Sequence, residues 1–247
     1  MRIISVMNYK GGTGKTSTVV HLAHGLALKG YRILIIDVDP QGSAGYHLGV
    51  NTIQRSLYDL ITQKETLANC IVHARKNLDI ICANEHLFPA EMHMANLQNR
   101  ELVLSSRMVN LTGYDFVFLD CAPSMNLLNQ NALLYSNELI IPVSMEYFSL
   151  VGIKQLLKNI KIINQLFKKN IIIKMVVPTF FDKRNKKSKD IINSIRRVFH
   201  KKVSTPIRSS VSLSEAPGVK QTVFEYADKS TGAQDYKNLV KEVLENG

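Results

Sequence analysis

Cysteine is scarce in this 247-residue chain, and its spacing excludes two kinds of site. The three cysteines are Cys70, Cys82 and Cys121, and none of them belongs to a CxxC pair. The chain therefore lacks the pattern of a cysteine-held metal cluster or of a redox centre, and Cys121 is expected to be a small buried residue. So few cysteines, with no signal-like leader, predict a reducing, cytoplasmic location.

Long apolar runs, internal repeats and low-complexity tracts are missing as well. No run approaches the roughly 20 apolar residues that span a bilayer, which predicts a soluble protein. Hydrophobic residues still make up 45% of the chain, enough to bury a sizeable core at this length. Because no convincing linker divides the sequence, we expect one domain over residues 1–247.

Acidic residues are scarce in the C-terminal part. Residues 1–150 hold 11 Lys and Arg against 12 Asp and Glu, whereas residues 151–247 hold 20 against 8. This asymmetry indicates a surface for a phosphate backbone, the alternative being an ordinary solvated lysine face. Few aromatics interleave with the lysines, which favours duplex DNA bound without sequence preference over stacked single strands. The candidate DNA-binding residues are Lys183, Arg184, Lys186, Lys187, Lys189, Arg196, Arg197, Lys201, Lys202, Arg208 and Lys220.

A glycine-rich segment near the start of the chain predicts a phosphate loop. It lies between a strand expected at residues 2–8 and a helix expected from Ser17 to Leu28. Backbone N–H groups and the positive helix end would converge there on phosphate oxygens, with Lys15 reaching the β- and γ-phosphates and Thr16 binding Mg²⁺. A strict Walker A motif has glycine where this chain has Tyr9. The predicted loop consists of Lys10, Gly11, Gly12, Thr13, Gly14, Lys15, Thr16 and Ser17.

Acidic residues follow two of the other predicted strands. Asp37 and Asp39 end the apolar run that begins at Ile33, and Asp120 ends the run that begins at Phe116. Carboxylates at the C-terminal ends of parallel strands lie where open α/β sheets bind ligands. The hydrophobic strand before Asp120 has the Walker B form, which predicts that Asp120 holds Mg²⁺ through water. For the Asp39-Pro40 pair the alternative is a simple turn.

The loop resembles the deviant Walker A box of the ParA/MinD family of P-loop ATPases, with Lys10 in the place of the family's signature lysine. The resemblance implies that two subunits sandwich two ATP molecules and that Lys10 crosses the interface to the partner's nucleotide. It also implies that Asp39 positions the attacking water and that Asp37 supports the hydrated Mg²⁺. Lys10, Lys15 and Asp39 are therefore the candidate catalytic residues.

The C-terminal third is similar to the ParA/Soj branch of that family. The similarity lies in Val177–Thr179, Thr205–Arg208, Leu213–Gly218 and Ser230–Ala233. It implies that Thr179 and Pro206 contact adenine, and that Arg208 and Lys220 face DNA. It further implies a nucleoid-associated partition or cargo-positioning ATPase whose slow hydrolysis is stimulated by a ParB-like or cargo adaptor protein. Only nine residues precede Lys10, so no N-terminal helix-turn-helix domain, and no operator-specific repression, is expected.

Two other functions stay open. A MinD-like membrane-positioning ATPase needs a basic amphipathic C-terminal helix, but the stripe in Tyr236–Gly247 has mixed charge and is better explained by core packing, so no stable membrane association is expected. A scaffold gated by nucleotide without hydrolysis is the second alternative. The presence of Asp37, Asp39 and Asp120 favours an enzyme.

Strand and helix patterns alternate along the chain. Strands are expected near residues 2–8, 32–37, 78–82, 115–120, 138–143 and 171–177. Short helices are expected between Asn51 and Leu111, including Ser56–Thr62 and Leu97–Val109, and Ser149–Lys168 is the clearest long helix. This alternation predicts an α/β fold, a doubly wound and mostly parallel sheet with helices on both faces, of the deviant Walker A P-loop NTPase type.

Overall fold

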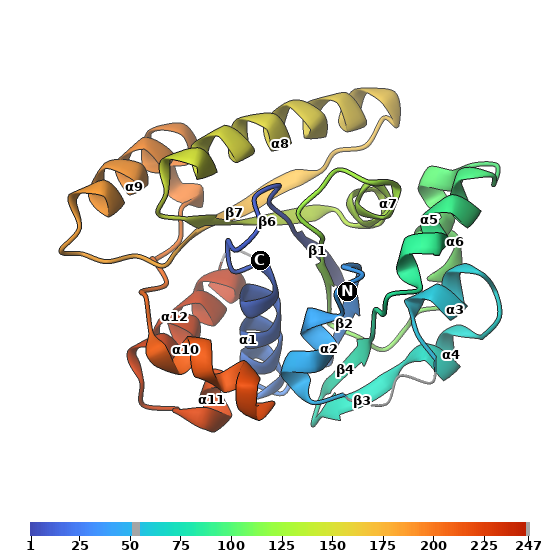
Figure 1. The fold of residues 1–247 in the computed structure, drawn as a ribbon, viewed down its shortest axis with the longest axis horizontal. Coiled ribbons are helices and arrows are strands. Elements are labelled where there is room, and N and C mark those ends of the chain that lie inside the picture. Colours follow the sequence, from blue (N-terminus) through green and yellow to red (C-terminus); the bar gives the residue numbers. More distant parts are fainter. Residues whose placement is uncertain (51–54, 246–247) are drawn as a thin grey trace.

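The computed structural model describes residues 1–50 and 55–245, and the first four residues of the predicted short-helix region, 51–54, lie outside that description, as do residues 246–247 of the C-terminal tail. Figure 1 shows strands and helices alternating along the chain around one central sheet. The strands are β1 (Arg2–Val6), β2 (Ile33–Asp37), β3 (Val72–Arg75), β4 (Leu78–Ile81), β5 (Phe116–Asp120), β6 (Glu138–Ser144) and β7 (Ile172–Thr179). The helices are α1 (Lys15–Ala27), α2 (Ser43–Leu48), α3 (Leu57–Ile61), α4 (Leu67–Cys70), α5 (Leu87–Ala95), η1 (Arg100–Leu102), α6 (Val103–Arg107), α7 (Leu127–Tyr135), α8 (Tyr147–Leu166), α9 (Lys186–Phe199), η2 (His200–Lys202), α10 (Val211–Glu215), η3 (Ala216–Val219), α11 (Val223–Tyr226) and α12 (Thr231–Glu245).

The sheet has the strand order β3-β4-β2-β5-β1-β6-β7, and every neighbouring pair is parallel except β3 with β4. The six predicted strands are confirmed. The short edge strand β3 was not predicted, because an alternation of only four residues, none of them fully buried, is too short to distinguish a strand. It joins the sheet through a tight turn at Lys76 and Asn77, the latter with φ of 61°. The mostly parallel, doubly wound fold is confirmed.

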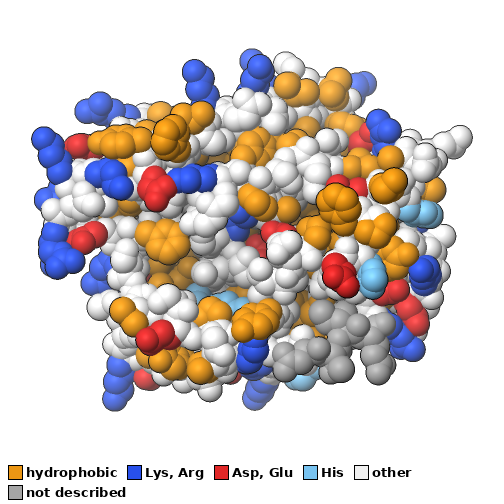
Figure 2. Space-filling model, in the orientation of Figure 1, with side chains coloured by type: hydrophobic (Ala, Val, Ile, Leu, Met, Phe, Trp, Pro, Cys, Tyr) orange, Lys and Arg blue, Asp and Glu red, His pale blue; other side chains and the backbone are white. Residues whose placement is uncertain are grey.

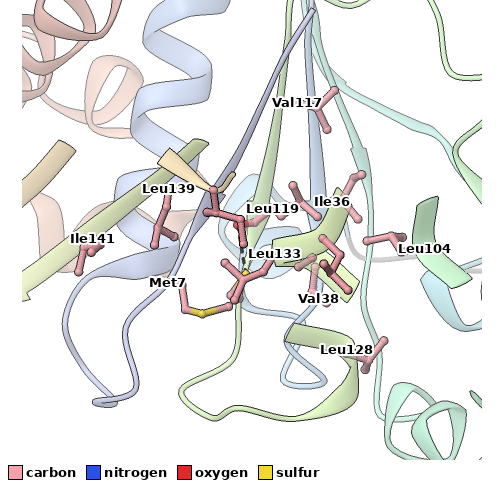
Figure 3. Packing of buried hydrophobic residues seen from close by; sticks show 14 of the residues in the cluster. Met7, Ile36, Val38, Leu104, Val117, Leu119, Leu128, Leu133, Leu139 and Ile141 are labelled. Carbon is pink, nitrogen blue, oxygen red and sulfur yellow. Dashed lines mark hydrogen bonds between the residues drawn. The ribbon is translucent and has the colours of Figure 1, made fainter. Parts of the chain in front are cut away.

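Two hydrophobic cores cover the two faces of the sheet. Residues alternate between them along each central strand: Leu34 and Ile36 belong to one core, and Ile33 and Ile35 to the other. Figure 3 shows part of the first core, where Leu119 of β5 lies beside Leu133 of α7, and Val117 and Leu128 belong to the same cluster. In Figure 1, α7 and α8 lie on one side of the sheet, and α1 and α12 lie on the other. Strands buried on both faces explain the uninterrupted apolar runs of the sequence.

The helices differ from their predicted extents in two informative ways. The predicted helix Leu97–Val109 begins only at Arg100, because Asn99 adopts the left-handed conformation with φ of 52°, and it then runs as η1 followed directly by α6. The long helix α8 buries Ile153, Leu156, Ile160 and Ile163 as expected, but Leu166 is 72% exposed since the helix ends there. The apolar stripe of α12 packs against α1, so core packing does explain it. None of the described helices is both long and apolar enough to cross a membrane.

Three buried histidines attach the segment from Lys220 to Tyr226 to α1 and α2. His24 Nδ1 lies 2.6 Å from the Thr222 hydroxyl, His21 Nδ1 accepts the Val223 N–H, and His47 Nε2 lies 3.1 Å from the Gln221 carbonyl oxygen. Burial lowers the pKa of all three rings, that of His47 to about 4. Arg75, Glu225 and Lys220 are the charged groups beside them. All three imidazoles are therefore neutral in the fold at pH 7.

Acidification should weaken the fold through these histidines. In the unfolded chain they take up protons as the pH falls through about 6.5, whereas the folded protein resists protonation, so the free energy of unfolding falls with pH. The lowered pKa of His47 alone should reduce the free energy of unfolding by about 3 kcal/mol at pH 4. Urea unfolding between pH 7.5 and 5 should show a shallower pH dependence for His47→Gln and the wild-type slope for His93→Gln, whose ring is exposed. Equal slopes for both variants would contradict this account.

Candidate nucleotide-binding site

The loop between β1 and α1 is held open by bonds to the neighbouring strands. Asn8 Nδ2 donates to the Pro142 carbonyl oxygen at 2.7 Å, and Thr179 Oγ1 donates to the Thr13 carbonyl oxygen at 2.9 Å. Gly12 and Gly14 take positive φ angles of 69° and 80°, which non-glycine residues rarely adopt. The loop therefore curls ahead of the first turn of α1, with backbone N–H groups available to an anion at the positive end of a 13-residue helix.

Tyr9 explains why the loop departs from the strict Walker pattern. Its hydroxyl accepts a hydrogen bond of 2.7 Å from Asn159 Nδ2 on α8, and burial raises the pKa of the phenol. The side chain thus anchors the loop to α8 at a position where a glycine would make no contact. The remaining glycines leave the phosphate side open, since a Cβ at Gly11 or Gly12 would meet nothing within 4 Å.

The two loop lysines point in different directions. Lys15 is 7% exposed and its Nζ donates to the Lys10 carbonyl oxygen at 3.2 Å, inside the loop. Burial lowers its pKa, while Asp120 and Asp39 act in the opposite direction. Lys10 instead forms an ion pair at the surface with Glu146, the residue before α8, and its side chain keeps 27% exposure. One ammonium thus serves the interior of the loop and the other lies at the rim.

The predicted acids lie side by side because of the sheet register. Asp37 and Asp120 are direct partners on β2 and β5, and both are fully buried. Burial raises the pKa of Asp37 and the neighbouring Asp120 raises it further, against hydrogen bonds from the N–H groups of Asp39 and Ala44. Asp39 lies on the turn that follows β2, where Oδ1 accepts the Gln41 N–H. The structure therefore brings Lys15, Asp37, Asp39 and Asp120 together, as the sequence predicted.

The buried carboxylate of Asp120 indicates whether a cation fits the site beside the phosphate loop. Among the described residues neither of its carboxylate oxygens has a partner at hydrogen-bond geometry, although both are buried. Burial raises its pKa and Asp39 adds to the rise, whereas the Thr16 hydroxyl and the Lys15 ammonium favour the charged form. An unpartnered buried carboxylate is costly unless something else satisfies it. Hard oxygen ligands beside a phosphate loop suit Mg²⁺, so the residues present fit this ion.

A cavity of about 220 Å³ opens next to the loop and is closed by the segment after β7. Its walls combine apolar side chains with three serines and with Thr179, Tyr236 and Arg208, which suits a flat heterocycle with polar edges. Thr179 lines this cavity as expected for an adenine contact, whereas Pro206 does not and its neighbour Ile207 does. Phe180 was not foreseen, because nothing in the sequence distinguishes it from a core aromatic. The lining residues are Gly14, Ser17, Thr179, Phe180, Ile207, Arg208, Ser210, Leu213, Ser214, Pro217 and Tyr236.

The predicted DNA-binding residues do not form one group. Those from Lys183 to Lys202 lie on α9, on η2 and on the turn before α9, and all are exposed except the half-buried Lys187. Arg208 lines the cavity and forms an ion pair of 2.6 Å with the buried Asp235. Lys220 turns inward over the Tyr46 ring, and its Nζ is buried without a hydrogen-bond partner among the described residues. Their role toward DNA stays a prediction.

Two residues that the sequence did not indicate, Glu146 and Asn8, also shape the site. Glu146 follows β6 at the same edge of the sheet as Asp120, a position that could have indicated its role beside Lys10. Asn8 joins the loop to β6 through both ends of its amide. Cys121, predicted to be a small buried residue, is buried as are Cys70 and Cys82, and burial raises its pKa. Its thiol is therefore inert packing beside the site.

Comparison with known proteins identifies the family. The family model described as "AAA domain" matches residues 1–173. Sporulation initiation inhibitor protein Soj of Bacillus subtilis is 36% identical over 100% of this chain and 99% of its own length. Chromosome partitioning protein ParA of Caulobacter vibrioides is 33% identical over 99% of this chain and 94% of its own length. The chain belongs to the ParA/Soj family of ATPases.

A solved structure supports the fold of this ParA/Soj-family chain. Cobyrinic acid a,c-diamide synthase from Mycobacterium smegmatis, with bound ADP and magnesium, aligns at a TM-score of 0.84 and 26% identity. The alignment covers 99% of this chain and 94% of that protein. The resemblance expected from Lys10, Lys15 and the three acids is thus confirmed at the level of family and fold.

Replacing Asp120 should separate the energetic cost of its buried charge from its proposed role in binding Mg²⁺. Asp120→Asn should raise the free energy of unfolding of the nucleotide-free protein by about 1–3 kcal/mol at neutral and higher pH, because a buried charge is removed. The same variant should lose most of the thermal stabilisation that ATP with Mg²⁺ gives the wild type. Asp228→Asn, an exposed site, is the matched control. An Asp120→Asn protein with full Mg²⁺-dependent stabilisation would contradict the assigned role.

Proposed function

We propose that this chain is a Mg²⁺-dependent partition or cargo-positioning ATPase that forms an ATP sandwich dimer, binds duplex DNA without sequence preference, and is released when a partner stimulates hydrolysis. The observation that carries the proposal is the divergence of the two loop lysines. Lys15 lies inside the loop, whereas Lys10 lies at its rim, held by a carboxylate that is 57% exposed. A lysine placed at the rim can serve a nucleotide that belongs to another subunit.

Nucleotide binding is assigned to residues that the structure has already brought together. The N–H groups of the loop and the Lys15 ammonium would hold the β- and γ-phosphates, and the cavity beside Thr179 would hold the base. Thr16 and Asp120, with Asp37 behind them, would hold Mg²⁺ directly or through water. The bound ion would neutralise charge on the phosphates during transfer.

Hydrolysis is assigned to Asp39, which lies next to the phosphate loop. Its carboxylate influences the pKa of both Lys15 and Asp120, so it lies within electrostatic reach of the phosphate site. There it would orient the attacking water and accept its proton, a positioning role that leaves phosphate binding to the loop. The turnover expected is slow, from ATP to ADP and phosphate.

Dimer formation would require Lys10 to leave Glu146. The pair lies at the surface, with side chains 27% and 57% exposed, and ion pairs screened by solvent in this way are weak. A second subunit's triphosphate offers a far higher charge density in a site that excludes water, so it would outcompete a single exposed carboxylate. The homodimer would therefore depend on ATP, and hydrolysis would remove the charge that draws Lys10 across.

DNA binding and cargo complete the proposal. The exposed cations of α9 and η2 would contact backbone phosphates, which places the ATP-bound dimer on the nucleoid of the cytoplasm. The stimulating partner is a ParB-like or cargo adaptor protein. A membrane role is less well supported, because the apolar stripe of α12 is buried against α1. Residues 1–247 would act together as one ATPase unit.

Replacement of Lys15 and replacement of Lys10 should impair two different steps, nucleotide binding and dimerisation. Lys15→Ala should abolish nucleotide binding, because it removes the cation inside the loop. Lys10→Ala should bind ATP as a monomer and fail to dimerise. Light scattering with Mg²⁺ and ATP measures the mass, and fluorescent-nucleotide titration measures the affinity. If Lys10→Ala dimerises as tightly as the wild type, the interface assignment is wrong.

Replacement of the proposed water-positioning carboxylate should uncouple binding from turnover. Asp39→Ala should retain ATP and dimerise, yet hydrolyse ATP at least 100-fold more slowly in the presence of the partner protein, since general-base groups contribute 10²–10⁴-fold. Phosphate release assays test the rate, and dissociation from DNA should slow in parallel. Asp182→Ala, a partly exposed site beside Arg184 and away from the phosphate loop, is a control that should keep wild-type turnover. Unchanged turnover in Asp39→Ala would refute the assignment.

A further inference from the structure

Helix α8 carries three lysines on its outward face that the sequence analysis left unassigned. Lys154, Lys158 and Lys161 are all exposed, while the opposite face of the helix packs on the sheet through its isoleucines. Spacings of four and three residues place them on one side of the helix, and at 1.5 Å per residue the row extends about 10 Å along the axis. Between Tyr147 and Leu166 the helix contains no acidic residue.

The charge of this lysine row is not neutralised by neighbouring carboxylates. Within residues 1–50 and 55–245, the ion pairs involve Arg2, Lys10, Arg55, His73, Arg75, Arg100, Arg184, Arg208 and Lys241, and none includes a lysine of α8. Structural surface lysines commonly alternate with acids along a helix face, which gives them partners four residues away. The absence of acids on α8 removes that explanation.

The lysine row is continuous with the basic surface of α9 and η2. Helices α8 and α9 are in contact, and Lys161 and Lys202 line the same groove between α8 and η2. Across α8, α9 and η2 the structure has ten Lys and Arg and a single acid, Asp190. In Figure 2, blue side chains stand along the upper edge of the molecule, over α8, and around its left end, over α9. The two helices therefore form one electropositive surface.

We propose that Lys154, Lys158 and Lys161 bind backbone phosphates of duplex DNA, as a second row beside the cations of α9. The inference rests on the proposed function and extends it to a helix that no motif indicated. Three point charges spread over about 10 Å can face about three phosphates of one DNA strand, because these lie about 3.4 Å apart along the axis. Residues 152–166 contain no aromatic side chain, so these contacts position the duplex without reading bases.

An anionic membrane is the other polyanion that such a helix could meet, and the packing of α8 argues against it. A helix that lies in a membrane interface inserts its apolar face into the lipid. In α8 that face is already covered, because Ile153, Leu156, Ile160 and Ile163 are buried in the core against the sheet. Between Lys154 and Lys161 the exposed side chains are the three lysines and Gln155, whereas the exposed apolar side chains of α8 lie before and after this stretch, so the row itself favours phosphate contacts in water.

A charge-matched pair of triple variants tests the proposal. In Lys154→Gln/Lys158→Gln/Lys161→Gln the row is removed. In Lys29→Gln/Lys76→Gln/Lys229→Gln three exposed lysines outside α8 and α9 are removed, with the same loss of net charge. Fluorescence anisotropy with two unrelated duplexes, with Mg²⁺ and ATP, gives log K against log salt concentration. The α8 variant should bind at least tenfold more weakly at low salt, and its slope should be shallower by about 2–3 per subunit, whereas the control should keep the wild-type slope.

Dimerisation and ATP turnover, measured on the same samples, separate the possible failures. Both should be unchanged in the α8 variant, because none of its substitutions touches the phosphate loop. If the wild type and the α8 variant bind duplexes equally, the α8 proposal is wrong and the proposed function stands. If the wild type dimerises with ATP but binds no duplex, DNA binding fails for α8 and α9 alike. Loss of binding to phosphatidylglycerol vesicles with unchanged duplex binding would overturn the proposal in favour of a membrane surface.

Discussion

The register of β5 between β1 and β2 is the constraint on which the site depends. It pairs Asp120 with Val6 on one side and with Asp37 on the other, so the phosphate loop and both buried acids emerge from one edge of the sheet. A parallel sheet permits this because all its strands end at the same edge, and the crossover helices keep that edge free. The two cores, one on each face, hold the register, since a slip by one residue would exchange every side chain between them.

The site itself is electrostatically incomplete without a ligand. Asp37 and Asp120 are buried together, Asp120 has no hydrogen-bond partner in the part of the chain that the structure describes, and Lys15 loses solvation inside the loop. Each of these groups is costly alone, and a magnesium ion with a triphosphate would satisfy all of them at once. At the rim of the loop the charge of Lys10 is already paired, but its partner is the exposed carboxylate of Glu146. In the proposed nucleotide-controlled dimer, occupation of the interior and exchange of Lys10 between partners would thus be two separate events.

The sequence predicted the parts of this structure that depend on local pattern. Strands buried on both faces produce apolar runs, and the loop has a fixed order of residue types, so six strands, the fold and the cluster of Lys15, Asp37, Asp39 and Asp120 could be foreseen. What could not be foreseen depends on tertiary placement. Strand β3 forms only because β4 is beside it, Pro206 lies next to the cavity while Ile207 lines it, and Arg208 is paired with Asp235, 27 residues away. The proposed role of the α8 lysines depends on the position of α8 beside α9, which the sequence pattern does not give.

The central claim is that Lys10 crosses to a partner's nucleotide, and the reactivity of its amine toward acylating reagents measures this directly. In the nucleotide-free protein Lys10 is partly exposed and should react, whereas Lys15 is buried and should not. With ATP and Mg²⁺, and the Asp39→Ala variant to slow hydrolysis, mass spectrometry should find Lys10 protected only at protein concentrations where the mass doubles, and ADP should give no protection. A doubled mass with Lys10 as reactive as in the monomer would contradict the account.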